Sequence, residues 1–249
     1  MAGIRIYFSD TQTLKVGDRA EIEGEAAHHL LRVLRAKRGD VVTLFDGMGG
    51  AACGGLVEVG KRTAKAEILE ISLAALEHPL RLGLGALKGK AMDDAVRYAT
   101  VLNFTDISFL VTDFGDVSLE ADRAARRLEG LARVALEACK QCGRLRIPQL
   151  QWRNSLEVWL DEPGTGKGQV VASLEAGSIP ILSHLERVSG EAPLTVAVGP
   201  AGDFSEREYA MLRDRGFEAV RLGEPILRAE MAVAYIGAVV DSWRVRARG

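Results

Sequence analysis

The pattern of apolar residues changes near residue 75, and this change limits the possible folds more than any other feature of the chain. Before it, short β-rich runs alternate with glycine turns, in segments 5–8, 41–46, 55–59 and 64–72. Apolar and polar residues alternate along these runs, which is typical of half-buried strands. The sequence therefore predicts a small β-barrel domain over residues 1–74. One helix, over residues 25–38 and ending at Gly39, interrupts it.

The second part of the chain, residues 75–249, alternates predicted strands with predicted helices. Strands are expected at 81–87, 106–112, 169–174, 194–198 and 218–222, and helices at 91–102, 119–142, between Ser205 and Gly216, and at 229–244. Ser205 and Glu208 have the spacing of a capping box at the start of the third helix. Such alternation predicts a parallel sheet with helices on both faces, and hence an α/β domain.

The composition excludes several classes of protein. Of 249 residues 47% are apolar, which is enough for a sizeable core, and 32 basic against 34 acidic residues give a net charge of −2. A uniformly basic protein that binds nucleic acid by bulk charge is excluded, so a polyanion must meet a local patch. The first residues lack a signal-peptide core, and no apolar run reaches the ~18 residues of a membrane span. We therefore expect a cytoplasmic protein that does not contact membranes.

Two short motifs have simpler interpretations than the chemistry they suggest. Gly83, Gly85 and Gly89 follow a predicted strand, but their spacing is one residue longer than that of the dinucleotide fingerprint. A Rossmann-type oxidoreductase therefore stays as a less favoured alternative. Cys139 and Cys142 lie at the C-terminal end of a predicted helix, where the helix dipole disfavours a thiolate. They are interpreted as small core residues, and no metal site is expected.

Two glycine-containing loops in the last third of the chain follow the carboxyl ends of predicted parallel strands, where open α/β sheets bind ligands. Gly199, Gly202 and Gly223 would let the backbone approach a ligand closely. The second loop leads into Arg228 and Glu230, a cation and a carboxylate that a catalytic site could use. A short-range ion pair that holds the loop is the alternative role for these two residues.

Basic residues cluster in two segments. Residues 123–146 carry seven basic and two acidic side chains, a local charge of +5, and a second cluster contains Arg32, Arg35, Lys37 and Arg38. A solvated helix face is the ordinary explanation of such a run. Together the two clusters predict separate phosphate-contacting patches, as structured RNA requires.

Five segments in this order resemble one known family: HHLLRVLR (28–35), LFDG (44–47), EACKQCGRLRIP (137–148), VGPAGDFSEREY (198–209) and LGEPILRAEMA (222–232). They are similar to the small-subunit (16S) ribosomal RNA uridine-N3 methyltransferases, the RsmE family of the SPOUT methyltransferases. The resemblance implies a PUA-like β-barrel that docks on RNA. It also implies a SPOUT α/β domain whose C-terminal segment threads a trefoil knot and holds S-adenosyl-L-methionine, and a homodimer that acts on ribosomal RNA or the small ribosomal subunit.

The resemblance also assigns roles to residues. The expected cofactor site consists of Leu174, Glu175, Gly199, Pro200, Gly202, Leu222, Gly223, Ile226, Leu227 and Ala232. Because N3 of uridine is protonated at neutral pH, Glu230 is expected to accept its proton, and Arg228 to stabilise charge on the flanking carbonyl oxygens. The expected RNA contacts are His29, Arg32, Arg35, Arg126 and Arg144.

The chain departs from the family pattern at four places. Ala201–Gly202–Asp203 stands where the family usually has Glu-Gly-Gly, and Ala229–Glu230–Met231 where it has Thr-Glu-Thr. Phe114 stands in place of an expected Arg, and residues 101–103 replace the usual Glu-Leu-Gly. These departures are compatible with a changed target or weakened catalysis. A divergent knot protein that binds RNA without methylating it is therefore the other alternative.

Overall fold

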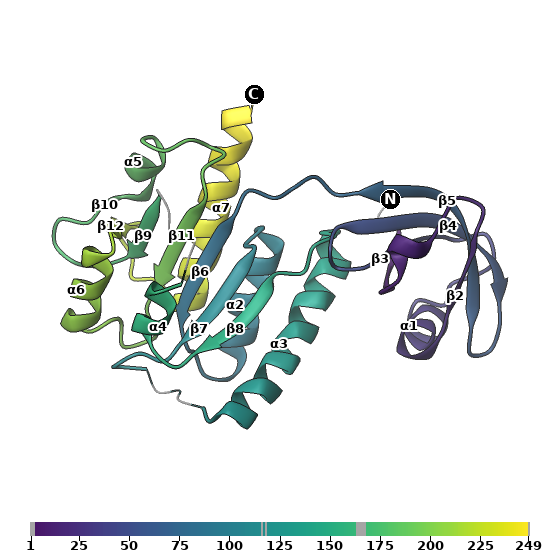
Figure 1. Ribbon diagram of the computed structural model, residues 1–249, viewed down its shortest axis with the longest axis horizontal. Coiled ribbons are helices and arrows are strands. Elements are labelled where there is room, and N and C mark those ends of the chain that lie inside the picture. Colours follow the sequence, from purple (N-terminus) through teal and green to yellow (C-terminus); the bar gives the residue numbers. More distant parts are fainter. Residues whose placement is uncertain (1–2, 116, 118, 163–167, 249) are drawn as a thin grey trace. The chain divides into compact units, whose positions relative to one another are not determined.

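The computed structural model of the protein describes residues 3–115, 117, 119–162 and 168–248. It divides into two compact units, shown in Figure 1. The first comprises Met1–Leu76 and Leu136–Ile147, and the second Glu77–Ala135 and Pro148–Gly249. The predicted domains 1–74 and 75–249 were each continuous, whereas segment Leu136–Ile147 belongs to the first unit.

The first unit contains a five-stranded sheet of order β1-β3-β4-β5-β2. Its strands are β1 (Ile4–Tyr7), β2 (Arg19–Ile22), β3 (Val41–Phe45), β4 (Gly50–Val59) and β5 (Ala64–Leu73), with a short 3₁₀ turn, η1 (Thr11–Thr13), after β1. β1 pairs with β3 in parallel and the other pairs are antiparallel. A bulge in β4 brings Gly54 so close to the backbone of Glu67 that a Cβ atom would lie 2.2 Å from its oxygen. Strand β2 was not predicted because it is short and half charged.

The helix of the first unit ends earlier than predicted. α1 (Gly24–His28) continues into one π-helical turn, η2 (His29–Val33). The Ala36 N–H then donates to the Leu30 carbonyl at 3.1 Å, and Arg35 between them has a φ of +52°. Arg35 therefore occupies the left-handed position that usually ends a helix with glycine. The prediction that the helix runs to Gly39 was wrong.

Two apolar clusters stabilise the first unit. The main core packs strand residues such as Ile6, Leu44 and Ile68 against Leu30. The second joins Phe45 to Cys139, together with Leu136, Leu145 and Ile147. It explains why the segment that ends α3 (Ala121–Cys142) belongs to this unit.

Asp46, from the LFDG segment, holds the β3–β4 turn. Its carboxylate accepts hydrogen bonds from the Thr11 hydroxyl (2.7 Å) and from the N–H groups of Met48 (2.7 Å) and Gly50 (2.9 Å). Burial alone would raise the pKa of Asp46, but these hydrogen bonds outweigh it and lower the pKa. The motif is therefore part of the fold of this unit.

The second unit is built on a seven-stranded sheet of order β10-β12-β9-β11-β6-β7-β8. Its strands are β6 (Leu80–Gly85), β7 (Asp106–Leu110), β8 (Gln149–Arg153), β9 (Gln169–Ala172), β10 (Ile179–Pro180), β11 (Leu194–Val198) and β12 (Glu218–Arg221). Every pair is parallel, as predicted. Strands β8 and β10 were not predicted.

The helices of this unit are α2 (Gly89–Val101), most of α3, α4 (Leu156–Leu160), α5 (Ile181–Leu185), α6 (Glu206–Asp214) and α7 (Ala229–Arg248). α2 and α7 cover one face of the sheet and α4 and α6 the other (Figure 1). The Arg244 guanidinium of α7 donates to the carbonyls of His78 (2.9 Å), Pro79 (3.0 Å) and Ala192 (3.2 Å), and so ties the last helix to the start of β6. Within the described part of the chain, no helix is both long and apolar enough to cross a membrane.

Candidate active site

Three loops meet at the carboxyl edge of the parallel sheet, because β9 lies between β11 and β12. They enclose a cavity of about 130 Å³. Most of the predicted cofactor residues line it: Leu174, Gly199, Pro200, Leu222, Gly223, Ile226, Leu227 and Ala232. Glu175 and Gly202 are outside this lining. The Glu175 carboxylate instead accepts a hydrogen bond from Arg213 at 3.0 Å, and Gly202 lines a second cavity.

The lining of this first cavity is mainly apolar side chain and loop backbone. Among its described residues, Asp203 is the one that carries a charge. At Gly223 a Cβ atom would meet only a proline carbon, at 3.8 Å, so the backbone there is open to a ligand. Such a site suits a flat apolar ring whose polar edge is recognised by backbone groups.

The other two glycines of the predicted site have a different role. A Cβ atom at Gly199 would lie 2.7 Å from an Asp203 oxygen, and one at Gly202 would lie 3.1 Å from the Cβ of Phe114. Both are glycine because atoms of the protein itself occupy the space. Packing within the protein is therefore sufficient to explain both glycines, without a ligand close to their backbone.

Asp203 stands at one of the departures from the family pattern, and its backbone explains the glycine usually found there. Its φ is +64°, in the left-handed region. Its carboxylate accepts hydrogen bonds from the Phe204 N–H (2.8 Å) and the Tyr209 hydroxyl (3.0 Å), which makes the conformation acceptable for Asp. Burial, together with the negative charge of Asp203, raises the pKa of Tyr209, so the phenol stays a hydrogen-bond donor.

A second cavity, of about 460 Å³, adjoins the first. The two cavities share the wall formed by Pro200, Ala201, Ile226, Leu227 and Ala229. Arg228 and Glu230 line only the second, together with Lys88 and Phe114. Sequence reasoning missed Lys88, which immediately precedes α2; no local pattern distinguishes it from other exposed lysines.

Arg228 and Glu230 lie at the start of α7. The Arg228 carbonyl accepts a hydrogen bond from the Ala232 N–H at 2.8 Å, so Glu230 is in the first helical turn. Arg228 is exposed and Glu230 half-buried. Among the described residues no ion pair joins Arg228 to Glu230. The loop-holding ion pair, the alternative role considered for these two residues, is therefore not formed among the described residues.

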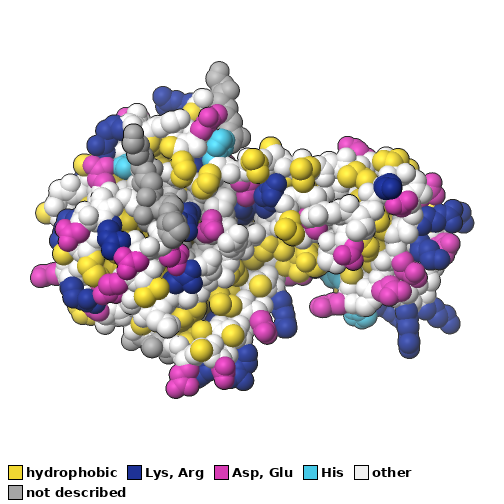
Figure 2. All heavy atoms as spheres, in the orientation of Figure 1, with side chains coloured by type: hydrophobic (Ala, Val, Ile, Leu, Met, Phe, Trp, Pro, Cys, Tyr) yellow, Lys and Arg dark blue, Asp and Glu magenta, His cyan; other side chains and the backbone are white. Residues whose placement is uncertain are grey.

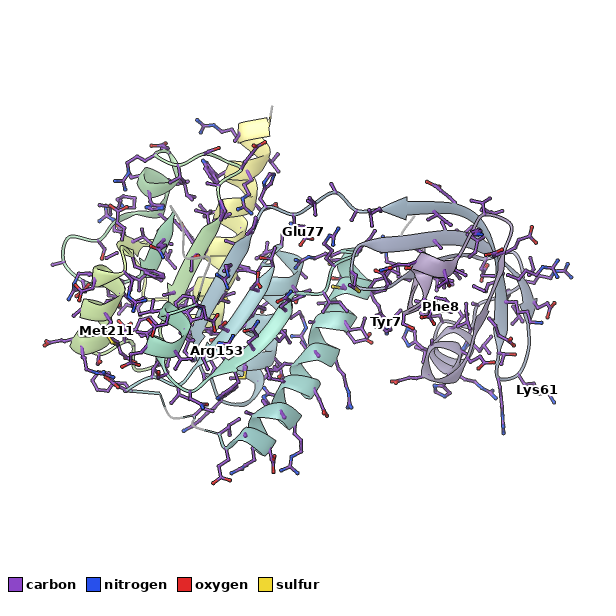
Figure 3. All side chains as sticks on the ribbon, viewed as in Figure 1. Tyr7, Phe8, Lys61, Glu77, Arg153 and Met211 are labelled. Atoms are coloured by element: carbon purple, nitrogen blue, oxygen red, sulfur yellow. The ribbon has the colours of Figure 1, made fainter. Side chains whose placement is uncertain are left out.

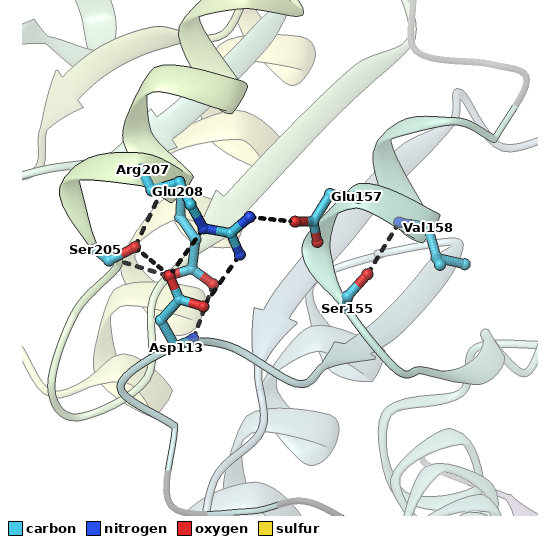
Figure 4. Close-up of polar contacts among 7 residues, drawn as sticks. All are labelled: Asp113, Ser155, Glu157, Val158, Ser205, Arg207 and Glu208. Atoms are coloured by element: carbon cyan, nitrogen blue, oxygen red, sulfur yellow. Dashed lines mark hydrogen bonds and ion pairs between the residues drawn. The ribbon is translucent and has the colours of Figure 1, made fainter.

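A polar network fixes the loop that carries Phe114 (Figure 4). Glu208, 1% exposed, accepts hydrogen bonds from the N–H groups of Ser205 (2.9 Å) and Asp113 (3.0 Å). The Ser205 hydroxyl accepts from the Glu208 N–H, which completes the predicted capping box, and donates to Asp113 at 2.6 Å. Hydrogen bonds from Arg207 and Ser205 lower the pKa of Asp113. The start of α6 and the loop after β7 therefore form one rigid support.

The predicted RNA contacts differ in exposure. In the first unit Arg32 and Arg35 are exposed and His29 is half-buried. Figure 2 shows Lys and Arg side chains projecting from the end of this unit, and Figure 3 shows Lys61 in the β4–β5 turn there. Lys61 was not included in the predicted contacts.

Only some of the basic side chains in residues 123–146 are accessible to RNA phosphates. Arg126 is exposed, but Arg144 is only 9% exposed. Arg127 pairs with Asp93 at 2.7 Å, and Arg146 donates to the carbonyls of Met48 and Ala74. Arg144 was expected to contact phosphate, but its side chain is enclosed by protein. It is therefore not accessible to a polyanion in this structure.

Packing explains two of the glycines that suggested a dinucleotide-binding site. A Cβ atom at Gly83 would lie 2.5 Å from the Trp159 ring, and one at Gly85 would lie 2.5 Å from Pro200. These glycines therefore accommodate protein packing, which removes the reason to place a pyrophosphate beside them. Of the two cysteines interpreted as core residues, Cys139 is buried but Cys142 is exposed. No group of His, Cys, Asp or Glu that could hold a metal ion occurs among the described residues.

Comparison with known families identifies the chain. A family model described as "RNA methyltransferase domain" matches residues 75–241, more than half of the chain, and one described as "RNA methyltransferase PUA domain" matches residues 22–69. The chain belongs to this RNA methyltransferase family. Both cavities described above lie within the part of the chain that matches the methyltransferase domain.

Relatives in the family agree with this assignment. "Ribosomal RNA small subunit methyltransferase E 2" of Borreliella burgdorferi is 25% identical over 84% of each chain. The methyltransferase E of Neisseria gonorrhoeae, solved with S-adenosyl methionine, is 27% identical, covers 98% of both chains and has a TM-score of 0.81. A putative methyltransferase of Legionella pneumophila, solved with the same cofactor, is 25% identical over 97% of this chain and 98% of that one, with a TM-score of 0.83.

Proposed function

We propose that this protein transfers a methyl group from S-adenosyl-L-methionine to N3 of a uridine in small-subunit (16S) ribosomal RNA. The observation that carries the proposal is the pair of cavities that share one wall, one apolar with open backbone and one with a cation and a carboxylate. Such a pair lets a donor and an acceptor meet in a fixed orientation, from which much of the rate of group transfer can come. The relatives' names and the cofactor in two of their structures support it.

The first cavity would hold the cofactor. Leu174, Ile226 and Leu227 offer apolar surface for the adenosine, and Gly223 offers open backbone. The carboxylate of Asp203 provides negative charge in the lining for a cationic sulfonium. When bound, S-adenosyl-L-methionine supplies an electrophilic methyl group.

The second cavity would hold the uridine. Its N3 carries a proton at neutral pH, and a lone pair must be freed before N3 can attack a methyl group. Glu230 accepts that proton as the general base. Arg228 stabilises the negative charge that then develops on the two flanking carbonyl oxygens.

The RNA would be oriented by basic residues outside the cavities. We propose residues 1–74 as the RNA-docking domain and residues 75–249 as the methyltransferase domain. The contacts we retain are Arg32, Arg35 and His29 in the first unit and Arg126 in the second, since the three arginines are exposed. With 6% aromatic residues, shape and phosphate recognition should dominate over stacking.

We further propose a trefoil knot, a homodimer and a cytoplasmic location. The knot is supported by the order in which the strands form: after β9 the chain forms β10 and then β11, and the last strand, β12, enters the sheet between β10 and β9. The homodimer is supported by a groove of about 700 Å³ along α5 and α7, lined by Leu182, Leu185, Tyr235, Val239 and Trp243 among others. An apolar groove of this kind is a typical subunit contact.

A labelled methyl donor tests the function. Small ribosomal subunits from a strain that lacks the enzyme are incubated with the protein and methyl-labelled S-adenosyl-L-methionine, and the RNA is digested for mass analysis of its nucleosides. We expect label in 3-methyluridine at one site. Tight RNA binding without label would instead support the RNA-binding alternative.

Cofactor binding can be tested separately. At about 100 times its dissociation constant the cofactor should add ~2.7 kcal/mol of stability. For a chain of this length that raises the melting temperature by roughly 5 to 10 °C. A shift with a nicotinamide dinucleotide but none with S-adenosyl-L-methionine would overturn the assignment.

A further inference from the structure

Phe114 is a large apolar side chain that is exposed beside the charged residues of the second cavity. It follows β7, is 60% exposed, and lines the second cavity together with Lys88, Arg228 and Glu230. Among the described residues of that lining it is the one aromatic side chain. A phenyl ring that is mostly exposed contributes little to the core, and its place in the lining of this cavity makes it available to a ligand.

The backbone that carries the Phe114 ring is held in place. The Asp113 N–H donates to buried Glu208 at 3.0 Å, and the Gly115 N–H donates to the Thr112 carbonyl at 3.0 Å, so the backbone on both sides of Phe114 is fixed. A Cβ atom at Gly202 would lie 3.1 Å from the Cβ and 3.2 Å from the carbonyl oxygen of Phe114. Gly202 thus lies directly against the Cβ atom and the carbonyl of Phe114 and fixes the position from which its ring projects. A ligand that packs on this ring meets a side chain whose backbone is already ordered, which lowers the ordering cost of binding.

The chemistry of the cavity indicates which ligand would pack there. A nucleobase presents a flat π face to an aromatic ring, and stacking of this kind is a general way to hold an unpaired base. Lys88, which is exposed in the same lining, supplies positive charge for a phosphate. The volume of about 460 Å³ is within the range of small-ligand sites and suits one nucleotide.

We propose that Phe114 stacks on the base of the RNA nucleotide that enters the second cavity and positions it for methyl transfer. This inference rests on the proposed function, because it names how the substrate of that same site is held. Phe114 is then a substrate-binding residue: it contacts the face of the base while Glu230 and Arg228 act on its reacting edge.

The test compares four variants on small ribosomal subunits from a strain that lacks the enzyme. Phe114→Leu keeps apolar volume without a π face, Phe114→Ala removes both, and Phe114→Trp keeps the face. Val158→Ala is the control, since Val158 is an exposed apolar residue in the same unit that lines neither cavity. For each variant we measure kcat/KM for methyl transfer, RNA affinity by filter binding, the affinity for S-adenosyl-L-methionine and the melting temperature.

Loss of a stacked base should lower kcat/KM by about 5- to 150-fold in Phe114→Leu and Phe114→Ala. Phe114→Trp and Val158→Ala should stay within about 3-fold of the wild type, since stacking tolerates a change of aromatic ring. Cofactor affinity and melting temperature should not change in any of the four, because Phe114 is outside the first cavity. A merely apolar contact would predict that Phe114→Leu behaves like Phe114→Trp, and that result would overturn the inference.

The outcomes separate this inference from the proposed function. If the wild type does not methylate but binds RNA, and Phe114→Leu weakens binding while Phe114→Trp does not, the stacking role stands and the function fails. If the wild type methylates and Phe114→Leu equals it in both measurements, the function stands and the stacking role fails. If the wild type neither methylates nor binds, both are overturned.

Discussion

The loops after β11 and β12 leave the same edge of the sheet and line the same two cavities, yet they are built differently. In the β11 loop the polar side chains bind protein: Asp203 accepts from Phe204 and Tyr209, and Ser205 bonds with Asp113. In the β12 loop Ile226 is 78% exposed and Arg228 is exposed as well. One loop is thus a support and the other presents side chains to a ligand. Substitutions in the first should reduce stability and those in the second activity.

The largest expected effect is that of Glu230→Gln. Loss of a general base should lower the methylation rate by about 100- to 10,000-fold, with the melting temperature almost unchanged because Glu230 has no partner among the described ion pairs. Radiolabel transfer and thermal unfolding measure the two quantities. The control is Glu224→Gln, an exposed carboxylate of the same loop that lines neither cavity. Near wild-type turnover in Glu230→Gln would remove Glu230 from the mechanism.

On the supporting side, Glu208→Ala should cost stability. The substitution leaves the buried N–H of Ser205 without its acceptor, at about 1–3 kcal/mol, and also removes the part-buried hydrogen bond of the Asp113 N–H, at about 1 kcal/mol. For a total of about 2–4 kcal/mol, thermal unfolding should show a decrease of roughly 4 to 16 °C in a chain of this length. Glu206→Ala, in the same helical turn but exposed, should change the melting temperature by less than about 2 °C. An equal decrease of the melting temperature in both variants would contradict the supporting role of the β11 loop.

Acid should weaken the same support, by less than Glu208→Ala does. The pKa of Asp113 is lowered below its ordinary value of 3.8 by hydrogen bonds from Arg207 and Ser205. Because the folded-state pKa is the lower one, the stabilisation is present above the ordinary value and is lost as the pH falls through the folded-state pKa. Melting curves from about pH 5 to pH 2 should therefore fall more steeply for the wild type than for Asp113→Asn. The exposed Asp214→Asn should follow the wild type.

The basic residues also divide into buried and exposed side chains, and their substitution is expected to have the smallest effect of those considered. Exposed Arg126 should contact phosphate, so Arg126→Ala should flatten the slope of log RNA affinity against log salt by up to about one unit. Arg144 is buried, and Arg144→Ala should leave the slope unchanged while lowering the melting temperature. Filter binding over a salt series measures both. A flattened slope in Arg144→Ala would show that burial does not decide the RNA contacts.

Local patterns predicted local structure well. The strand Leu194–Val198 and the capping box of Ser205 and Glu208 are present as expected, because both depend on residues a few positions apart. Short elements without a period were missed: β8, β10, α4 and α5. The helix before Arg35 was predicted too long, because the pattern does not show that a non-glycine residue adopts a positive φ.

The sequence by itself determined that two glycine loops and their neighbours would form a ligand site, since glycine, proline and strand patterns act within each loop. It did not determine which strands pair. Only the tertiary structure placed β9 between β11 and β12, and thereby made Leu174 line one cavity with Gly199 and Gly223. Only the tertiary structure brought Lys88 and Phe114 to Arg228 and Glu230, and buried Arg144 while leaving Arg126 exposed. The physical reason is that periodicity reports whether a residue is buried, whereas its neighbours depend on long-range strand pairing and helix packing that no local pattern encodes.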